Sequence, residues 1–293
     1  MQVANLLYNV ALVAALWATG VGLGLSSDVG RFVAPLRRRR ILTTIIVLDV
    51  VAIPALVWAL SHAFNLSADS ATGLILVGIA SGGPLGIIAC RIAGADARAA
   101  FSFVVILETV NAVAIPIWVA LLLPPGVRVS PIQVFATLII LVLLPLVVGL
   151  GLRARYGPRV ARLANPLATL SNVLVLFVIA LVLVRDSRDV ASAISNGVAA
   201  VAAITILAAL AAGWLLGGPE RNSRAVVALV TGVRANALAL AIARASFPSR
   251  TAVQAAVVAF GVFSVTLPLA ASFLLARRTR REIRTLRQDY DNA

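Results

Sequence analysis

Nine apolar stretches of about twenty residues each follow one another along the chain. They occupy residues 4–25, 41–61, 71–92, 100–123, 131–152, 166–184, 196–216, 222–245 and 251–276. At 1.5 Å per residue, an α-helix needs about twenty residues to cross a hydrocarbon layer of about 30 Å. The stretches are continuously apolar, without the two-residue alternation of a barrel strand, which favours helices. We therefore predict an all-α polytopic membrane protein in which residues 1–293 form a single integral membrane unit with nine transmembrane helices.

The composition excludes several classes of function. Only 12% of the residues are charged, about half the share typical of a soluble domain, which argues against a water-soluble enzyme and a nucleic-acid partner despite the net charge of +14. The single cysteine, Cys90, and the single histidine, His62, argue against a metal centre. An intramembrane enzyme would need clustered aspartates, a Ser–His arrangement or a His-Glu-x-x-His motif, and none is present. We expect no enzymatic activity, no metal and no cofactor.

The placement of arginine predicts the orientation of the helices. Nineteen arginines lie in the loops after the first, third, fifth and seventh stretches and in the tail, whereas four lie in the opposite loops. Basic residues accumulate on the cytoplasmic side, so we expect an inner (plasma) membrane protein with its N-terminus outside and its C-terminus in the cytoplasm. The basic tail from Arg277 is expected to contact anionic lipids at the cytoplasmic face. No basic residue precedes the first stretch, so we interpret it as a retained helix and not as a secretion signal.

The two halves of the chain resemble each other at an offset of 152 residues. Pro116 then aligns with Pro268, and Leu76-Val-Gly, shortly before Gly82, lies within one residue of the partner of Leu229-Val-Thr, which directly precedes Gly232. Stretches one to four correspond to stretches six to nine, and an offset of five helices reverses direction across the membrane. The sequence thus predicts an inverted repeat, a common construction of secondary transporters that bind substrate where the repeats meet.

Two of the expected helices should be discontinuous. Residues 81–86 read Ser-Gly-Gly-Pro-Leu-Gly, where Pro84 cannot supply an amide hydrogen to the carbonyl of Ala80, and Gly82 and Gly83 leave the backbone free. Arg234 aligns with Gly82 in the repeat, within Val230-Thr-Gly-Val-Arg-Ala-Asn236. A kinked helix packed through small residues explains the first motif alone. Two interruptions at equivalent positions favour a transport site that both helices build.

Three ionisable residues lie deep inside these stretches: Asp49, Glu108 and Arg234. Each needs a partner or water, because an intramembrane charge costs roughly 2.5–3.5 kcal/mol. One interpretation is an ion pair between Glu108 and Arg234 that holds the halves together. The other makes Arg234 the anchor of an anionic substrate, with Glu108 neutralising it in the empty state or binding a coupling cation. Asp49 is interpreted as hydrogen-bonded to a neighbouring helix, with proton carriage as the alternative.

The segments 77–84 and 232–239, together with Gly22-Leu-Gly-Leu-Ser26 and the arginines at 37–40, resemble the bile acid:sodium symporter family. The resemblance implies a core domain, here 41–123 and 196–276, in which two broken helices cross. It also implies a panel domain, here 4–25, 131–152 and 166–184. The implied function is transport of organic anions by alternating access between the two domains.

The chain departs from this family at the expected sodium ligands. Gly86-Ile87 stands where sodium-using members have Ser-Asn, and Val230 and Arg234 stand where they have glutamate and glutamine. Oxygen ligands for a hard cation are therefore largely missing. We expect Arg234 to replace the sodium ion with a fixed positive charge, which makes sodium coupling doubtful and favours a proton or no coupling ion.

These features predict a secondary transporter of small amphipathic organic anions. The expected substrate-binding residues are Arg234, Asn236, Gly82, Gly83, Asn111 and Thr231, and the expected ion-pair or coupling residues are Glu108 and Asp49. Asn111 and Asn236 could instead join helices to each other. A cation/proton exchanger of the same inverted-repeat type is the alternative, although its two carboxylates, Asp49 and Glu108, are at separate places.

Overall fold

The computed structural model describes residues 2–26, 38–123, 130–185 and 187–291, and this part of the chain is all-helical. Its only strand-like feature is an isolated β-bridge between Ser81 and Arg234. The first half contains α1 (Gln2–Ser26), α3 (Arg39–Ile46), η1 (Val47–Ala52), α4 (Ile53–Ala63), α5 (Ala68–Ile79), α6 (Leu85–Ala93) and α7 (Ala97–Leu122). The middle contains α8 (Pro131–Leu138), η2 (Ile139–Leu143), α9 (Leu144–Tyr156), η3 (Gly157–Leu163), α10 (Ala164–Arg185) and α11 (Ser187–Ala193). The last part contains η4 (Ile194–Val198), α12 (Ala199–Leu216), α13 (Arg221–Gly232), α14 (Asn236–Ser246) and α15 (Thr251–Asp291).

Six helical stretches of the described chain are long and apolar enough to cross a membrane. One of them runs from 132 to 182 and includes the η3 turn, where the backbone of Gly157 has a φ of +68°. The expected fifth and sixth stretches therefore meet inside this long segment. The expectation of an all-α polytopic chain is confirmed.

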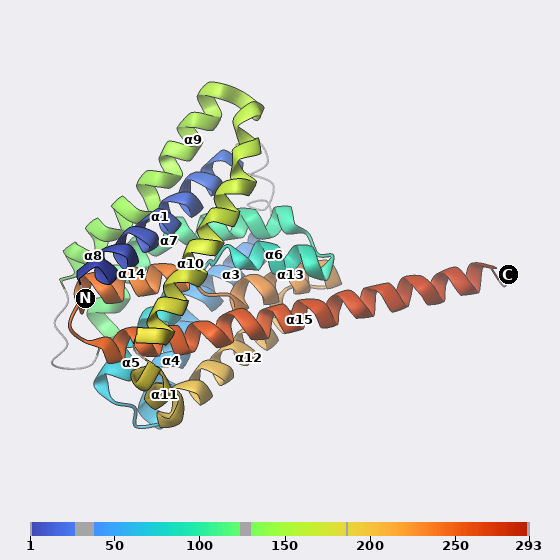
Figure 1. Cartoon of the computed structure of the whole chain (residues 1–293). Coiled ribbons are helices and arrows are strands. Elements are labelled where there is room, and N and C mark those ends of the chain that lie inside the picture. Colours follow the sequence, from blue (N-terminus) through green and yellow to red (C-terminus); the bar gives the residue numbers. More distant parts are fainter. Residues whose placement is uncertain (1, 27–37, 124–129, 186, 292–293) are drawn as a thin grey trace.

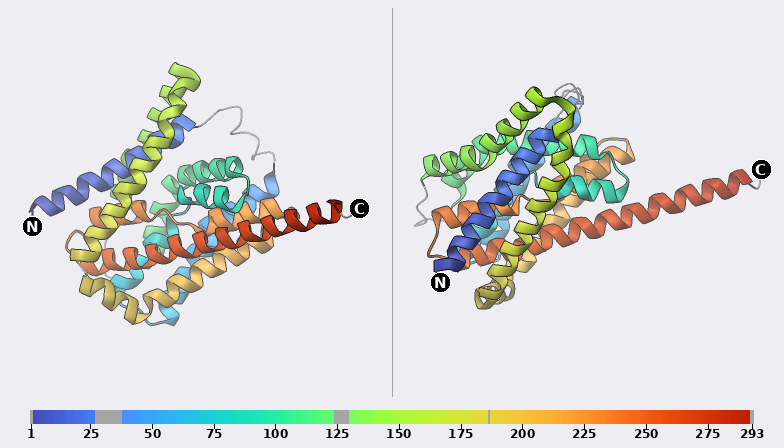
Figure 2. Two further views of the ribbon diagram at one scale, coloured as in Figure 1. Left: turned by 45° about the vertical axis from the view of Figure 1, so that its right-hand side comes forward. Right: turned by 45° about the horizontal axis from the view of Figure 1, so that its top comes forward.

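Helix α1 packs against both α9 and α10, toward the upper left of Figure 1. The approach of α1 to α9 depends on glycine, because a Cβ atom at Gly24 would lie 2.5 Å from the carbonyl oxygen of Leu146. Both views in Figure 2 show α1, α9 and α10 beside the other helices. Within those helices α5 packs against α15, where a Cβ atom at Gly73 would lie 2.5 Å from the carbonyl oxygen of Val253. Small residues thus set the helix spacing, as is common in membranes.

The helix from Arg39 to Ala63 widens to a π-helix at η1, where Asp49 lies. Pro54 has no amide hydrogen to donate to the carbonyl of Val50, four residues earlier. Trp118 in α7 supplies the missing donor, and its Nε1 lies 2.6 Å from that oxygen. The irregular turn that carries Asp49 is thereby joined to α7.

Helix α15 continues without interruption to Asp291 and projects beyond the other helices (Figures 1 and 2). Three of the arginines from which the orientation of the helices is predicted, Arg31, Arg37 and Arg128, lie outside the described residues. So do the side chains beyond Arg277, on which the expected lipid contact of the tail depends.

Candidate functional site

The first interruption separates α5 from α6 at the motif that predicted it. Helix α5 ends at Ile79 and α6 begins at Leu85. Pro84 leaves the carbonyl of Ala80 without its helical donor, and the backbone N–H of Ala235 donates to this carbonyl at 2.9 Å. Gly82 has a φ of +79°, which only glycine adopts readily.

The second interruption, between α13 and α14, lies against the first. Residues 233–235 are not helical, and Arg234 forms the antiparallel bridge with Ser81. A Cβ atom at Gly83 would lie 2.5 Å from the carbonyl oxygen of Arg234, so the two extended segments touch only because position 83 has no side chain. The expectation of two discontinuous helices that meet is confirmed.

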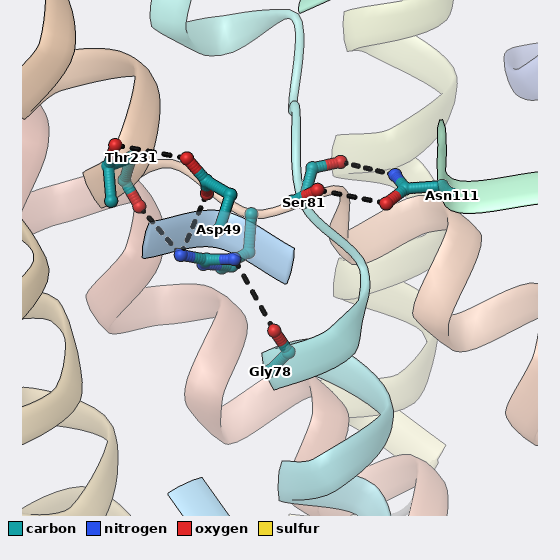
Figure 3. A network of polar contacts seen from close by, with 6 residues as sticks. Asp49, Gly78, Ser81, Asn111 and Thr231 are labelled. Carbon is teal, nitrogen blue, oxygen red and sulfur yellow. Dashed lines mark hydrogen bonds and ion pairs between the residues drawn. The ribbon is translucent and has the colours of Figure 1, made fainter. Parts of the chain in front are cut away.

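Arg234 is buried at this crossing and pairs with Asp49. Its Nη2 lies 3.0 Å from Oδ1 of Asp49, and both side chains are 0% exposed. Nη2 also donates to the carbonyl of Thr231 at 2.9 Å, and Nη1 donates to the carbonyl of Gly78 at 3.3 Å (Figure 3). The hydroxyl of Thr231 donates to Oδ2 of Asp49 at 3.0 Å, which satisfies the second carboxylate oxygen.

The ion pair expected between Glu108 and Arg234 is therefore not formed, because Asp49 occupies that place. The expectation that Asp49 hydrogen-bonds a neighbouring helix is confirmed by its contact with Thr231 in α13. Glu108 lies in α7 and is 6% exposed. Within the described chain, no hydrogen bond or ion pair joins the side-chain carboxylate of Glu108 to another residue. Its backbone packs against the first interruption, since a Cβ atom at Gly82 would lie 3.6 Å from the amide nitrogen of Glu108.

Asn111 joins α7 to the first interruption. Its Oδ1 accepts a hydrogen bond from the Ser81 hydroxyl at 2.9 Å, and its Nδ2 donates to the Ser81 carbonyl at 2.8 Å. Figure 3 shows the two side chains facing each other beside the Asp49 network. In this conformation Asn111 connects two segments of the chain, which is the structural alternative that the sequence left open.

Asn236 opens α14 and lines a narrow apolar cavity. The lining residues are Leu12 in α1, Val175, Val178 and Ile179 in α10, Asn236, Ala237 and Leu240 in α14, and Val257, Val258 and Gly261 in α15. The space open to the centre of a water molecule is about 10 Å³, roughly enough for one water. The cavity thus lies between α1 and α10 on one side and α14 and α15 on the other, and neither Arg234 nor Glu108 lines it.

Two residues of the site, Ser81 and Ser264, are absent from the substrate-binding residues that the sequence predicts. Ser81 pairs with both Asn111 and the second interruption, and Ser264 in α15 accepts a hydrogen bond from Nδ2 of Asn236 at 2.6 Å. Ser81 is part of the glycine motif, so its position carried a usable signal. Ser264 lies in an ordinary apolar stretch and carried none.

Two interrupted helices that meet around a buried ion pair, within an all-helical apolar chain, define the class as a membrane transporter with broken helices. Residues 13–193 match the sodium bile acid symporter family, which is more than half of the chain, and the chain belongs to that family. A similar protein is the uncharacterized sodium-dependent transporter YocS of Bacillus subtilis (strain 168), with 24% identity over 260 residues. The alignment covers 86% of this chain and 78% of YocS. The chain is therefore a multi-pass membrane transporter of this type, as the motifs predicted.

Proposed function

We propose that the protein is a secondary transporter that moves small amphipathic organic anions by alternating access. The observation that carries this proposal is the apolar cavity between the helices α1 and α10 on one side and α14 and α15 on the other. The first pair belongs to the expected panel domain and the second pair to the expected core domain. Because the cavity holds about one water in this conformation, an organic anion enters only when the two groups of helices separate.

The bounds of the broken helices support the inverted repeat. At an offset of 152 residues, α5 would correspond to 220–231 and α6 to 237–245, each within one residue of the bounds of α13 and α14. Thr19 and Ser171, whose hydroxyl oxygens are 2.6 Å apart, are separated by the same 152 residues. Equivalent residues of two repeats touch only near the axis that relates the repeats. We propose nine spans, as such a repeat requires. We also propose that the protein lies in the inner membrane, with its N-terminus outside and its C-terminus in the cytoplasm.

Arg234 is proposed to act as a fixed internal cation. Its guanidinium contacts one carboxylate oxygen and two backbone carbonyl oxygens, which are ligands that a hard cation also uses. A guanidinium held in such a set of oxygens makes a bound sodium ion unnecessary for neutralising Asp49. Direct contact between Arg234 and a transported anion would require the pair with Asp49 to open during the cycle.

Within the cavity, the anion is proposed to bind beside Asn236, where the positive end of the α14 helix dipole favours its negative head group. Gly82, Gly83 and Thr231 then affect substrate binding without contacting the substrate. The close approach at the two glycines and the hydroxyl of Thr231 fix the position of α14. Apolar side chains of α10 and α15 accommodate the rest of the substrate. Anionic lipids at the cytoplasmic face remain the proposed partners of the tail.

A proton is the proposed coupling ion, with Glu108 as its carrier. A carboxylate in apolar surroundings loses hydration, and here no hydrogen bond or ion pair of the described chain compensates that loss. The charged or titratable residues on elements packed against α7 are Arg39, Arg40, Asp49, Asp69, Cys90, Arg91, Arg221 and Arg224, with Arg234 directly after α13. No interaction joins any of these to Glu108 in the described part of the chain.

Uptake of a radiolabelled medium-chain carboxylic acid into proteoliposomes tests the proposal. We expect saturable uptake that is equal in sodium and choline buffers and that rises with an inward proton gradient. Uptake that requires sodium would contradict the fixed-cation interpretation. The absence of any protein-dependent uptake or binding across a panel of organic acids would reject the proposed substrate class.

A further inference from the structure

Arg244, in the last turn of α14, reaches across to α1 at one end of the apolar cavity. Its guanidinium carbon lies 5.1 Å from the centre of the Tyr8 ring, a distance at which a cation is attracted to the face of an aromatic ring. Its Nε donates to Oδ1 of Asn9 at 3.4 Å. The N-terminal part of α1 lies beside α14 in Figure 1. One arginine thus joins the two groups of helices that line the cavity.

The contact lies one helical turn beyond a lining residue on each of the two helices. Residues four apart on a helix lie on the same face, one turn from each other. Tyr8 is four residues from Leu12 in α1, and Arg244 is four residues from Leu240 in α14. Leu12 and Leu240 both line the cavity. The contact therefore covers the end of the cavity that the proposed orientation places outside the cell.

The other contacts of the Arg244 guanidinium hold it to α14 and α15. Nη1 donates to the carbonyl of Pro248 at 3.4 Å and to Oε1 of Gln254 in α15 at 3.5 Å. Gln254 is buried and its Nε2 donates to the carbonyl of Phe247 at 3.4 Å, so its oxygen faces Arg244. Gln254 also lies one turn from Val258, a third lining residue. When the two groups of helices separate, Arg244 therefore stays with α14 and α15 and releases α1.

The exposure of Arg244 to solvent allows this release. Arg244 is partly exposed, and its hydrogen bonds to Asn9, Pro248 and Gln254 are 3.4 or 3.5 Å long. When α1 moves away, the charge of Arg244 stays in contact with water. The buried pair of Arg234 with Asp49 differs, because its opening leaves two charges without hydration. The contact of Arg244 with α1 is thus attractive and can still open in every transport cycle.

We infer that Arg244 is the outer gate of the transport path. Its contact with Tyr8 and Asn9 closes the cavity to the outside, and loss of this contact opens the cavity on that side. The inference rests on the proposed function, because it requires the two groups of helices to separate. It adds to that function the residues that control access from one side of the membrane.

Labelling of a cysteine in the cavity wall measures whether the gate is open, and it needs no substrate. The reference protein carries Val258→Cys in a Cys90→Ala background, because Val258 lines the cavity and is 3% exposed. It is labelled with impermeant thiol reagents in right-side-out and in inside-out membrane vesicles. A cationic and an anionic reagent are compared, so that the lost charge of Arg244 is not mistaken for opening.

Arg244→Gln should raise the rate of labelling from the outside about fivefold with both reagents, because the closed state loses the ring contact that favours it. Tyr8→Leu, which removes the ring and changes no charge, should have the same effect. Tyr8→Phe keeps the ring and should be labelled at the rate of the reference. Arg250→Gln is the matched control and should also keep that rate. Arg250 lies over the ring of Phe247 at 5.9 Å and pairs with Asp69, but neither partner is on α1 or α10.

Equal labelling of the reference and Arg244→Gln, or an equal rise in Arg244→Gln and Arg250→Gln, would overturn the gate. A rise of the same size from both sides of the membrane would also overturn it, because this would indicate a general loosening of the fold. In each of these cases the cavity still opens, and the proposed function is unaffected. If neither the reference nor any variant were labelled from either side, the cavity would not open, and the proposed function would be rejected together with the gate.

Discussion

The carbonyl oxygen of Ala80 accepts a hydrogen bond from the backbone N–H of Ala235, with the two atoms 2.9 Å apart. Pro84 removes the donor that this carbonyl would have in a continuous helix. Each interruption thus satisfies a backbone group of the other, and the polar backbone is not left unpaired at membrane depth. The crossing is consequently a single structural unit, and changes on one segment are expected to affect the other.

Removal of Asp49 should destabilise the protein strongly. Asp49→Ala leaves the buried guanidinium of Arg234 without its counter-ion, which typically costs about 3–5 kcal/mol. The double variant Asp49→Leu with Arg234→Met should recover most of this loss, because it buries no unpaired charge. Thermal unfolding, monitored by size-exclusion chromatography, measures the stability of each variant relative to the wild type. As a control, Asp69→Ala removes an exposed pair with Arg250 and should cost at most about 1 kcal/mol. Equal losses in Asp49→Ala and the double variant would contradict the buried-pair account.

A methyl group at position 83 should separate the two interruptions. Gly83→Ala places a carbon 2.5 Å from the Arg234 carbonyl, and overpacking of this kind costs about 1–3 kcal/mol. Gly151→Ala is the matched control, because the new carbon meets no atom within 4 Å apart from its chain neighbours and the backbone of its own helix, and the site is in the middle of α9. We expect lower thermal stability and uptake for Gly83→Ala and wild-type values or better for Gly151→Ala. Similar behaviour of the two variants would show that the close contact has no energetic role.

Replacement of Glu108 should separate net transport from exchange. Glu108→Gln keeps the size of the side chain but cannot release a proton, so uptake driven by a pH gradient should fall at least about tenfold. Counterflow, in which labelled and unlabelled substrate exchange without net proton movement, should persist. Asp69→Asn makes the same chemical change at an exposed position and should leave both assays unchanged. Loss of gradient-driven uptake and counterflow together would indicate a structural role for Glu108 instead.

Chemical cross-links should distinguish contacts within one moving group from contacts between the two groups. In a Cys90→Ala background, a short linker between cysteines at 19 and 171 joins α1 to α10 and should leave transport intact. A linker of the same length between cysteines at 12 and 258 joins α1 to α15 across the cavity and should block transport. Transport that continues with α1 and α15 linked would contradict alternating access between these helices.

Much of this arrangement was predictable from local sequence. The motif at 81–86 fixed the first interruption through the chemistry of proline and glycine, and the observed helix ends at Ile79 and Leu85 agree with it. The alignment at an offset of 152 residues located the second interruption, where local propensity alone was ambiguous. The expected core and panel domains, the nine spans and the orientation remain predictions.

The partner of Arg234 was not predictable in the same way. Asp49 and Glu108 are both single carboxylates inside apolar stretches, and the depth expected from the sequence favours Glu108 as the partner of Arg234. The position of a residue along a helix determines its approximate depth in the membrane. It determines neither which helix lies beside it nor how that helix is rotated about its axis.

The sequence by itself determined that the chain is a bundle of membrane helices, where two of them are interrupted and which charged side chains are buried. These properties follow from hydrophobicity and from backbone chemistry within a few residues. Only the tertiary structure decided that Asp49 neutralises Arg234, that Glu108 is left without a partner in the described chain, and that Arg244 contacts α1 at one end of a cavity. Those outcomes depend on packing between helices far apart in the sequence, and a single side-chain contact requires the rotation of both helices to be set.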